Sequence, residues 1–209
     1  MKKLLPPLPI ARIEKTHKYI WEPTGEQLAF STTQVCNTKT PEQLENIERY
    51  RHVSAALDAL AGWFGELAIS PVYESESVGF DGSDFLNLVV GVDTDMSVGE
   101  LSRRFKKLEA DNGRKASAPK FSPRTLDLDI LTWGDATGTL DGVELPRAEI
   151  LKNAFVLRPL ADIAPDELHP VCGESYRSLW QSYQKDQKLW PVDFTWQGRQ
   201  ISSSGAVAE

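Results

Sequence analysis

Apolar side chains recur at helical spacing in residues 46–65, NIERYRHVSAALDALAGWFG. Five of them fall on one face of a helix: Ile47, Tyr50, Leu57, Leu60 and Phe64. Gly65 is a natural stop, because glycine readily takes the left-handed conformation that ends many helices. The pattern therefore predicts a helix that begins near Asn46 and ends at Gly65.

A second helix is predicted to begin after Ser97. Glu100 follows three residues later, and this pair of residue types is the signature of a capping box. The apolar face of this helix consists of Val98, Leu101, Phe105 and Leu108. Gly113 lies just past its expected end. A third, shorter helix is expected around residues 174–185.

Three other segments predict strands. Residues 84–94, DFLNLVVGVDT, alternate between two faces, with Leu86, Leu88, Val90 and Val92 on one and Phe85, Asn87 and Val89 on the other. Residues 66–75, ELAISPVYES, predict a short strand that is interrupted at Pro71. Residues 124–134, RTLDLDILTWG, predict a strand whose Leu126, Leu128 and Ile130 share one face.

The order helix, strand, strand, helix, strand indicates an α+β fold. It becomes a ferredoxin-like βαββαβ antiparallel sheet with helices on one face if a strand precedes the first helix. We expect the main domain to cover residues 46–186, with an extra C-terminal helix. Residues 187–209 are expected to form a hairpin around Gly198 and a tail whose last eight residues fray.

Residues 1–45 form an atypical N-terminal extension in which only EQLAFSTTQV, residues 26–35, resembles a strand. In the ferredoxin-like order, the strand that precedes the first helix is central in the sheet. We expect this strand to have parallel neighbours on both sides, and such strands are usually continuous apolar runs. Two alternatives remain open. Either residues 26–35 supply this strand through a loop of about ten residues, or the strand is absent.

Composition narrows the class of protein. The chain has 209 residues, of which 41% are hydrophobic and 25% are charged, as in ordinary globular domains. The formal net charge of −7 argues against nucleic acid as a partner. No run approaches the roughly 18 apolar residues of a membrane span, so we expect a cytoplasmic protein with no membrane partner.

The strand at 124–134 contains two carboxylates, Asp127 and Asp129, although Asp is a poor strand former. Residues i and i+2 of a strand point to the same face, with Cβ atoms roughly 6–7 Å apart. This spacing allows the two carboxylates to hold one or two hard cations, with waters and phosphates as the other ligands. The alternative is an ordinary half-exposed strand in which one Asp pairs with Arg124.

Basic residues gather directly before this acidic pair. Residues 103–124 contain eight Lys or Arg and two acidic residues, a local charge of +6 in an acidic chain. Some of these cations fit a solvated helix face. Arg114, Lys120 and Arg124 belong instead to the polar loop that begins NGRKASAPKFSP, the kind of loop that can close over a polyphosphate.

A third candidate element surrounds the turn in residues 73–87, YESESVGFDGSDFLN. Phe85 and Asn87 lie on one strand face there, and Phe121 and Phe155 could extend the aromatic wall. Aromatic rings stack on a flat heterocycle, while an amide matches its donor and acceptor edges. The chain has no GxxxxGK[ST] motif, so it is not a P-loop NTPase.

Three stretches together resemble the 6-hydroxymethyl-7,8-dihydropterin pyrophosphokinases of folate biosynthesis. They are SPVYESESVGFDGSDFLNLVV, FSPRTLDLDILTWGD and LPRAEILKNAFVLRPLADIAPDELHP, and the resemblance runs from about Asn46 to Trp196. It implies a ferredoxin-like pyrophosphokinase domain that transfers pyrophosphate from ATP to the pterin hydroxymethyl group and releases AMP. It also implies ATP as co-substrate, two Mg²⁺ ions and small-molecule partners, and we expect a monomer.

The resemblance assigns roles to residues by position. Asp127 and Asp129 correspond to the Mg²⁺ ligands, and Arg114 and Arg124 to catalytic arginines. The positions that resemble ATP-binding residues are Glu109, Lys120, Ile130 and Arg147. The positions that resemble the pterin pocket are Ser75, Val78, Phe85, Asn87, Phe121 and Phe155.

The chain also departs from the family pattern. Arg147 and Ala148 stand where many members carry His and an aromatic residue, and Asn153 and Ala116 replace basic residues. Of the Gly-Ser-Asn that ends the family's first strand, only Asn46 remains. An alternative is therefore a nearly inactive paralogue that binds nucleotide or pterin, and another is a Mg²⁺-dependent phosphotransferase for a different flat heterocycle.

Overall fold

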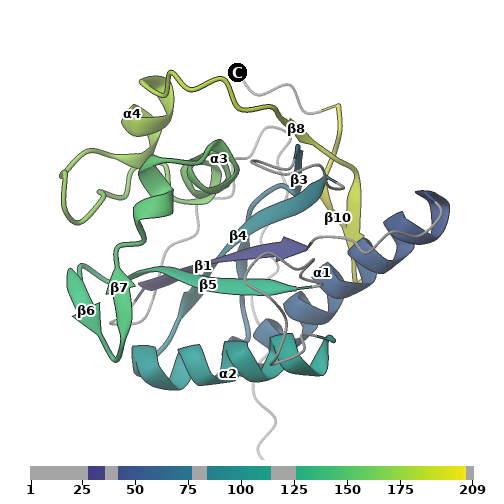
Figure 1. Cartoon of the computed structure of the whole chain (residues 1–209), viewed down its shortest axis with the longest axis horizontal. Coiled ribbons are helices and arrows are strands. Elements are labelled where there is room, and N and C mark those ends of the chain that lie inside the picture. Colours follow the sequence, from purple (N-terminus) through teal and green to yellow (C-terminus); the bar gives the residue numbers. More distant parts are fainter. Residues whose placement is uncertain (1–27, 36–41, 77–83, 114–125, 206–209) are drawn as a thin grey trace, which may run out of the picture.

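The computed structural model describes residues 28–35, 42–76, 84–113 and 126–205 (Figure 1). Its main sheet is antiparallel, in the order β5-β1-β4-β3-β8, with β2 pairing β4 outside this path. The strands of this sheet are β1 (Leu28–Val35), β2 (Ala68–Ile69), β3 (Tyr73–Ser75), β4 (Phe85–Asp93), β5 (Asp127–Trp133) and β8 (Leu189–Pro191). Two hairpins, β6 (Gly138–Leu140) with β7 (Val143–Leu145) and β9 (Phe194–Trp196) with β10 (Arg199–Ser202), lie outside the main sheet.

β1 supplies the central strand. Thr33 of β1 lies opposite Leu88 of β4 on one side and opposite Leu128 of β5 on the other. The alternative in which no strand precedes the first helix is therefore wrong. The expectation of parallel neighbours is also wrong, because both neighbours run antiparallel to β1. Antiparallel strands do not require a continuous apolar run, so the polar residues of LAFSTTQV are compatible with this position.

Two helices cover one face of the sheet. α1 (Glu42–Phe64) begins four residues before the predicted start, and α2 (Val98–Asp111) begins after Ser97, whose hydroxyl accepts from Glu100 N. Both helices pack on the same side chains of β4 and β5, since their buried residues belong to one core cluster. From α1 and α2 the cluster takes Val53, Ala56, Leu57, Leu60, Val98, Leu101 and Phe105, and from β4 and β5 it takes Leu86, Leu88, Val90, Val92, Leu128 and Ile130.

α3 (Ala154–Ile163) covers the opposite face, where Val89 and Leu131 pack with Val156, Leu157 and Leu160. It follows the 3-10 helix η1 (Ala148–Leu151), and α4 (Tyr176–Gln181) packs beside it. The expectation of helices on one face therefore holds for α1 and α2 only. The sequence analysis predicted α4 but no helix at 154–163, although LPRAEILKNAFVLRPL carries an apolar pattern there.

The C-terminal residues are part of the main body. β8 extends the sheet at its β3 edge, with Leu189 opposite Ser75. Gly198, with a φ of +75°, lies in the turn between β9 and β10. At the start of the expected frayed tail, Ser202 Oγ donates to Val72 O at 3.2 Å and Ser204 N donates to Asp193 Oδ1 at 2.8 Å. Residues 206–209 lie outside the described residues.

None of the helices in the described ranges is both long and apolar enough to span a bilayer.

Candidate active site

The side chains of Asp127 and Asp129 point to the face of β5 that is opposite the α1/α2 core. Leu126, Leu128 and Ile130 alternate with them and pack in that core. Leu131, which has the same parity as the two aspartates, packs with α3 instead. Asp127 is buried and Asp129 is partly exposed. The two carboxylates thus lie on the α3 side of the sheet.

Strand register places Asn87 on this same face. Gln34 of β1 lies opposite Asp127 of β5 and also opposite Asn87 of β4. Residues that lie opposite each other in an antiparallel pair point to the same side, and each strand spacing is about 4.8 Å. Asp127 and Asn87 are therefore on one face, about 10 Å apart across one intervening strand. One ligand can reach both.

Asn87 lies on the same face where β3 pairs with β4, and its side chain contacts residues of both strands. Its side chain is 1% exposed, and Nδ2 donates to Ser75 Oγ and to Phe85 O, both at 3.0 Å. These acceptors fix the orientation of the amide. Three residues assigned to the pterin pocket, Ser75, Phe85 and Asn87, therefore lie together.

A partly buried network that the sequence analysis missed connects this end of the sheet to α3. Tyr73 OH donates to Asp162 Oδ2 at 2.6 Å, and Arg158 Nε donates to Tyr73 OH at 3.1 Å. The Arg158 guanidinium also pairs with Asp162 at 3.1 Å and lies over the Trp180 ring at 5.4 Å. Burial, followed by the neighbouring Asp162, raises the pKa of Tyr73, so its hydroxyl stays protonated.

Arg147 approaches the carboxylates from the segment after β7. Its Nη2 lies 3.0 Å from Asp129 Oδ1, and its Nε lies 3.4 Å from Glu149 Oε2. The backbone N of Arg147 donates to Leu131 O at 2.8 Å, which ties this residue directly to β5. The structure thus brings one residue assigned to ATP binding next to one assigned to the metal.

Two other residues assigned to ATP binding have buried side chains. Glu109 of α2 is 3% exposed, and its Oε1 accepts from Leu128 N at 2.8 Å, between the two aspartates in sequence. Ile130 is also 3% exposed and packs in the α1/α2 core. Only the backbone of Ile130 could contact a nucleotide on the other face.

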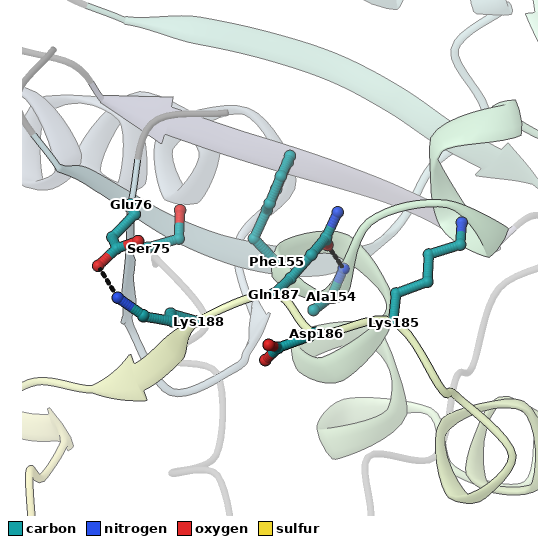
Figure 2. A pocket seen from close by; sticks show the side chains of 8 residues that line it. All are labelled: Ser75, Glu76, Ala154, Phe155, Lys185, Asp186, Gln187 and Lys188. Carbon is teal, nitrogen blue, oxygen red and sulfur yellow. Dashed lines mark hydrogen bonds and ion pairs between the residues drawn. The ribbon is translucent and has the colours of Figure 1, made fainter. Parts of the chain in front are cut away.

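A cavity of about 440 Å³ opens between β3, the start of α3 and the segment before β8 (Figure 2). Its volume is in the range of small-molecule sites. It brings Ser75 and Phe155 together from distant parts of the chain. The remaining lining residues are Glu76, Ala154, Lys185, Asp186, Gln187 and Lys188, and none of them was predicted.

Comparison with known families gives the identification. The sequence model of the 7,8-dihydro-6-hydroxymethylpterin-pyrophosphokinase (HPPK) family matches residues 45–165, more than half of the chain. The chain belongs to the HPPK family. The matched region contains all but the first three residues of α1 and continues through α3, but it does not contain β1. The central strand of this HPPK chain therefore lies outside the region that the family model recognises.

Curated relatives support this assignment. The chain is 31% identical to the 2-amino-4-hydroxy-6-hydroxymethyldihydropteridine pyrophosphokinase of Aquifex aeolicus over 145 residues, which are 69% of this chain and 88% of the relative. It is 37% identical to the enzyme of the same name from Pseudomonas aeruginosa over 126 residues, 57% of this chain and 75% of that one.

A solved structure shares the fold. The wild-type HPPK-DHPS chain of Plasmodium falciparum superposes with a TM-score of 0.59 at 13% identity, over 89% of this chain and 52% of that chain. The chain therefore spans about half the length of that HPPK-DHPS structure. At this identity the likeness concerns the fold alone.

Several assigned residues of this HPPK chain, namely Val78, Arg114, Lys120, Phe121 and Arg124, lie outside the described residues. In the part of the chain that the structure describes, no group of three or more His, Cys, Asp or Glu could hold a metal ion. Asp127 and Asp129 alone still fit Mg²⁺, since this ion is usually bound by one or two carboxylates plus waters and substrate phosphates.

Proposed function

We propose that this HPPK chain transfers pyrophosphate from ATP to the hydroxymethyl group of 6-hydroxymethyl-7,8-dihydropterin, giving the pterin diphosphate and AMP in folate biosynthesis. The observation that carries the proposal is the placement of Asp127 and Asn87 on one face of the sheet, one strand apart. A triphosphate bound near the carboxylates of Asp127 and Asp129 and a heterocycle bound near the amide of Asn87 would come into contact in the space between β5 and β4.

Asn87, Ser75, Phe85 and Phe155 would bind the pterin, with Val78 and Phe121 as further contacts. Both N–H donors of the Asn87 amide are held by Ser75 and Phe85, so its Oδ1 is preorganised as an acceptor for one orientation of the ring. Holding the hydroxymethyl group near the β-phosphorus is a large part of catalysis, because phosphoryl transfer depends mainly on positioning.

Asp127 and Asp129 would hold two Mg²⁺ ions, which when bound neutralise charge on the triphosphate. The oxygen of the pterin hydroxymethyl group bonds to the β-phosphorus and its proton passes to solvent. The bond between the β-phosphorus and the oxygen that bridges it to the α-phosphorus breaks, and AMP leaves with that oxygen. Arg147 lies beside Asp129 and is suited to contact a phosphate oxygen. Arg114, Arg124 and Lys120 are proposed as further phosphate contacts, and Glu109 and Ile130 as nucleotide-side positions.

The finer features of the fold are proposed on the same basis. The chain order β1-α1-β3-β4-α2-β5 and the spatial order β5-β1-β4-β3 support a ferredoxin-like arrangement. We further propose a cytoplasmic monomer that acts on small molecules. The alternative of a nearly inactive paralogue rests on two departures, the altered first strand and the basic residues replaced by Asn153 and Ala116. β1 at the centre of the sheet removes the first of these reasons, and the named HPPK relatives favour the enzyme.

The test is AMP formation from ATP and Mg²⁺ with and without 6-hydroxymethyl-7,8-dihydropterin. We expect AMP only when the pterin is present, and a loss of at least about 100-fold in Asp129→Asn. Asp135→Asn is the matched control, because Asp135 is exposed just after β5, and it should keep wild-type turnover. A folded wild-type protein that binds ATP but forms no AMP would refute the proposal.

A further inference from the structure

One wall of the cavity comes from residues 183–188, which connect α4 to β8 and which we call the 183–188 segment. It is attached to both of the other walls. β8, which directly follows it, pairs with β3 so that Leu189 lies opposite Ser75, and Lys188 Nζ pairs with Glu76 at 2.6 Å. At the α3 wall, Gln187 Oε1 accepts from Ala154 N at 2.6 Å (Figure 2).

The contact between Gln187 and Ala154 fixes the orientation of the Gln187 amide. Ala154 is the first residue of α3, and its backbone N–H can only donate, so the atom facing it must be the side-chain oxygen. The N-cap residue Asn153 makes no side-chain capping bond. Gln187 therefore provides, from 33 residues away, an acceptor that the start of α3 lacks.

The rest of the 183–188 segment holds Gln187 in place. Tyr183 OH lies 2.9 Å from Gln187 Oε1 and 2.9 Å from Lys152 O. Lys185 Nζ donates to Lys152 O at 3.0 Å. These contacts anchor the segment to the residues just before α3, so the side chain of Gln187 loses little further freedom when a ligand binds.

With its oxygen at the start of α3, Gln187 directs its Nε2 group elsewhere. Figure 2 shows Nε2 on the side to which the Phe155 ring points. Among the described residues no acceptor is recorded for this NH₂ group, whereas both lysines of the lining are engaged, Lys188 with Glu76 and Lys185 with backbone carbonyls. Gln187 thus offers two neutral hydrogen-bond donors in a cavity that the aromatic ring of Phe155 also lines.

We propose that Gln187 is an additional specificity-determining residue, whose Nε2 donates to an acceptor atom on the edge of the pterin ring. This inference rests on the proposed function, since it takes the ligand of the cavity to be the dihydropterin. A pterin ring carries a carbonyl oxygen and ring nitrogens on its edges, which a fixed amide can read. The role of the 183–188 segment is then to close the pocket between Ser75 and Phe155.

The decisive variant is Gln187→Glu. A carboxylate keeps the acceptor for Ala154 N–H and places a negative charge at the start of α3, where it is favourable, so the fold is retained. It removes both Nε2 donors. The matched control is Gln184→Glu, the same change at an exposed position of the same segment. Thermal unfolding of all three proteins verifies that they fold.

Binding of 6-hydroxymethylpterin is measured by calorimetry with Mg²⁺ and a non-hydrolysable ATP analogue. We expect Gln187→Glu to weaken pterin binding about tenfold, the effect of one lost hydrogen bond, and to leave binding of the ATP analogue unchanged. Gln184→Glu should bind both ligands as the wild type does. Equal pterin affinity in all three proteins, or an equal loss of affinity for both ligands in Gln187→Glu, overturns the inference.

A second measurement needs no variant. In the wild-type protein, the side-chain NH₂ resonances of Gln187 should shift on addition of 6-hydroxymethylpterin, while those of Gln184 stay in place. Unmoved Gln187 resonances in a protein that binds pterin and forms AMP overturn this inference and leave the proposed function intact. A wild-type protein that neither binds pterin nor forms AMP overturns both.

Discussion

Arg147 and Asp129 form an ion pair in which Nη2 and Oδ1 are 3.0 Å apart. Both side chains are partly exposed, at 30% and 40%, and the backbone of Arg147 is bound to β5 through Leu131 O. This cation therefore lies beside a carboxylate that is proposed to hold Mg²⁺. The resemblance to the family places this arginine at a position where many members carry histidine.

Removal of Arg147 should have opposite effects on metal and nucleotide. In Arg147→Ala, Asp129 loses a competing cation, and we expect the affinity for Mn²⁺ without nucleotide to rise about two- to fivefold, as for a partly screened pair. Affinity for a non-hydrolysable ATP analogue should fall about tenfold, because a charged phosphate contact is lost. Electron paramagnetic resonance of free Mn²⁺ and calorimetry measure the two affinities.

Glu149→Gln is the control for this prediction. It neutralises the other carboxylate near Arg147, which lies 3.4 Å from Nε, without removing the guanidinium. The ATP analogue should bind this variant as it binds the wild type. If Arg147→Ala leaves the affinity for Mn²⁺ unchanged, the ion pair does not compete with the metal.

Glu109 should stabilise β5 between the two aspartates. Its carboxylate accepts from Leu128 N at 2.8 Å and is buried, so Glu109→Ala leaves a buried N–H without this acceptor. We expect Glu109→Ala to lower the free energy of unfolding by about 1–3 kcal/mol in urea titrations. Glu109→Gln retains a carbonyl oxygen and should recover much of this loss. Equal stability of Glu109→Ala and the wild type would contradict the prediction.

Local sequence patterns predicted much of the fold. α1, α2, β4 and β5 follow from the pattern of apolar residues, although β4 is buried on both of its faces between Leu86 and Val92. The place of β1 could not be predicted in this way. Its sequence, LAFSTTQV, is only moderately apolar, and its position depends on pairing with β4 and β5, which lie about 50 to 100 residues further along the chain.

The candidate site was predictable where its residues lie on one strand. The i, i+2 spacing of Asp127 and Asp129 follows from strand geometry alone. The sequence analysis missed the 183–188 segment. Its place beside the site depends on contacts between distant residues, such as the hydrogen bond between Gln187 and Ala154, which are 33 residues apart. The contact of Tyr73 with Asp162 spans 89 residues and was missed for the same reason. Side-chain contacts between distant elements leave no periodic signal.

The central position of β1 can be tested with proline. In a strand with neighbours on both sides, every backbone N–H points to one neighbour or the other. Proline has no N–H, so Thr33→Pro removes one hydrogen bond between β1 and a neighbouring strand, at the position where Thr33 lies opposite Leu88 of β4 and Leu128 of β5. We expect a loss of more than about 3 kcal/mol, seen as insoluble protein or a strongly lowered melting temperature. Thr139→Pro in the exposed hairpin β6–β7 is the control and should cost much less. A Thr33→Pro protein with wild-type melting would exclude β1 from the sheet.

The buried His169 should make stability depend on pH. Burial lowers its pKa below 6.5, and its Nδ1 accepts from Val171 N at 3.3 Å and from Cys172 N at 3.4 Å, which only the unprotonated ring can do. The unfolded chain takes up this proton near pH 6.5, whereas the folded protein takes it up only at lower pH. Protonation therefore favours unfolding, and stability should fall as the pH drops below about 6.5, by at most about 1.4 kcal/mol per pH unit.

His169→Asn isolates this contribution. An asparagine oxygen can accept from the same two amides but does not titrate in this range. Urea titrations at pH 7.5, 6.5 and 5.5 should show a shallower loss of stability for His169→Asn than for the wild type. If His169→Asn loses stability as steeply as the wild type, protonation of His169 is not the cause, and carboxylates elsewhere must account for the acid dependence.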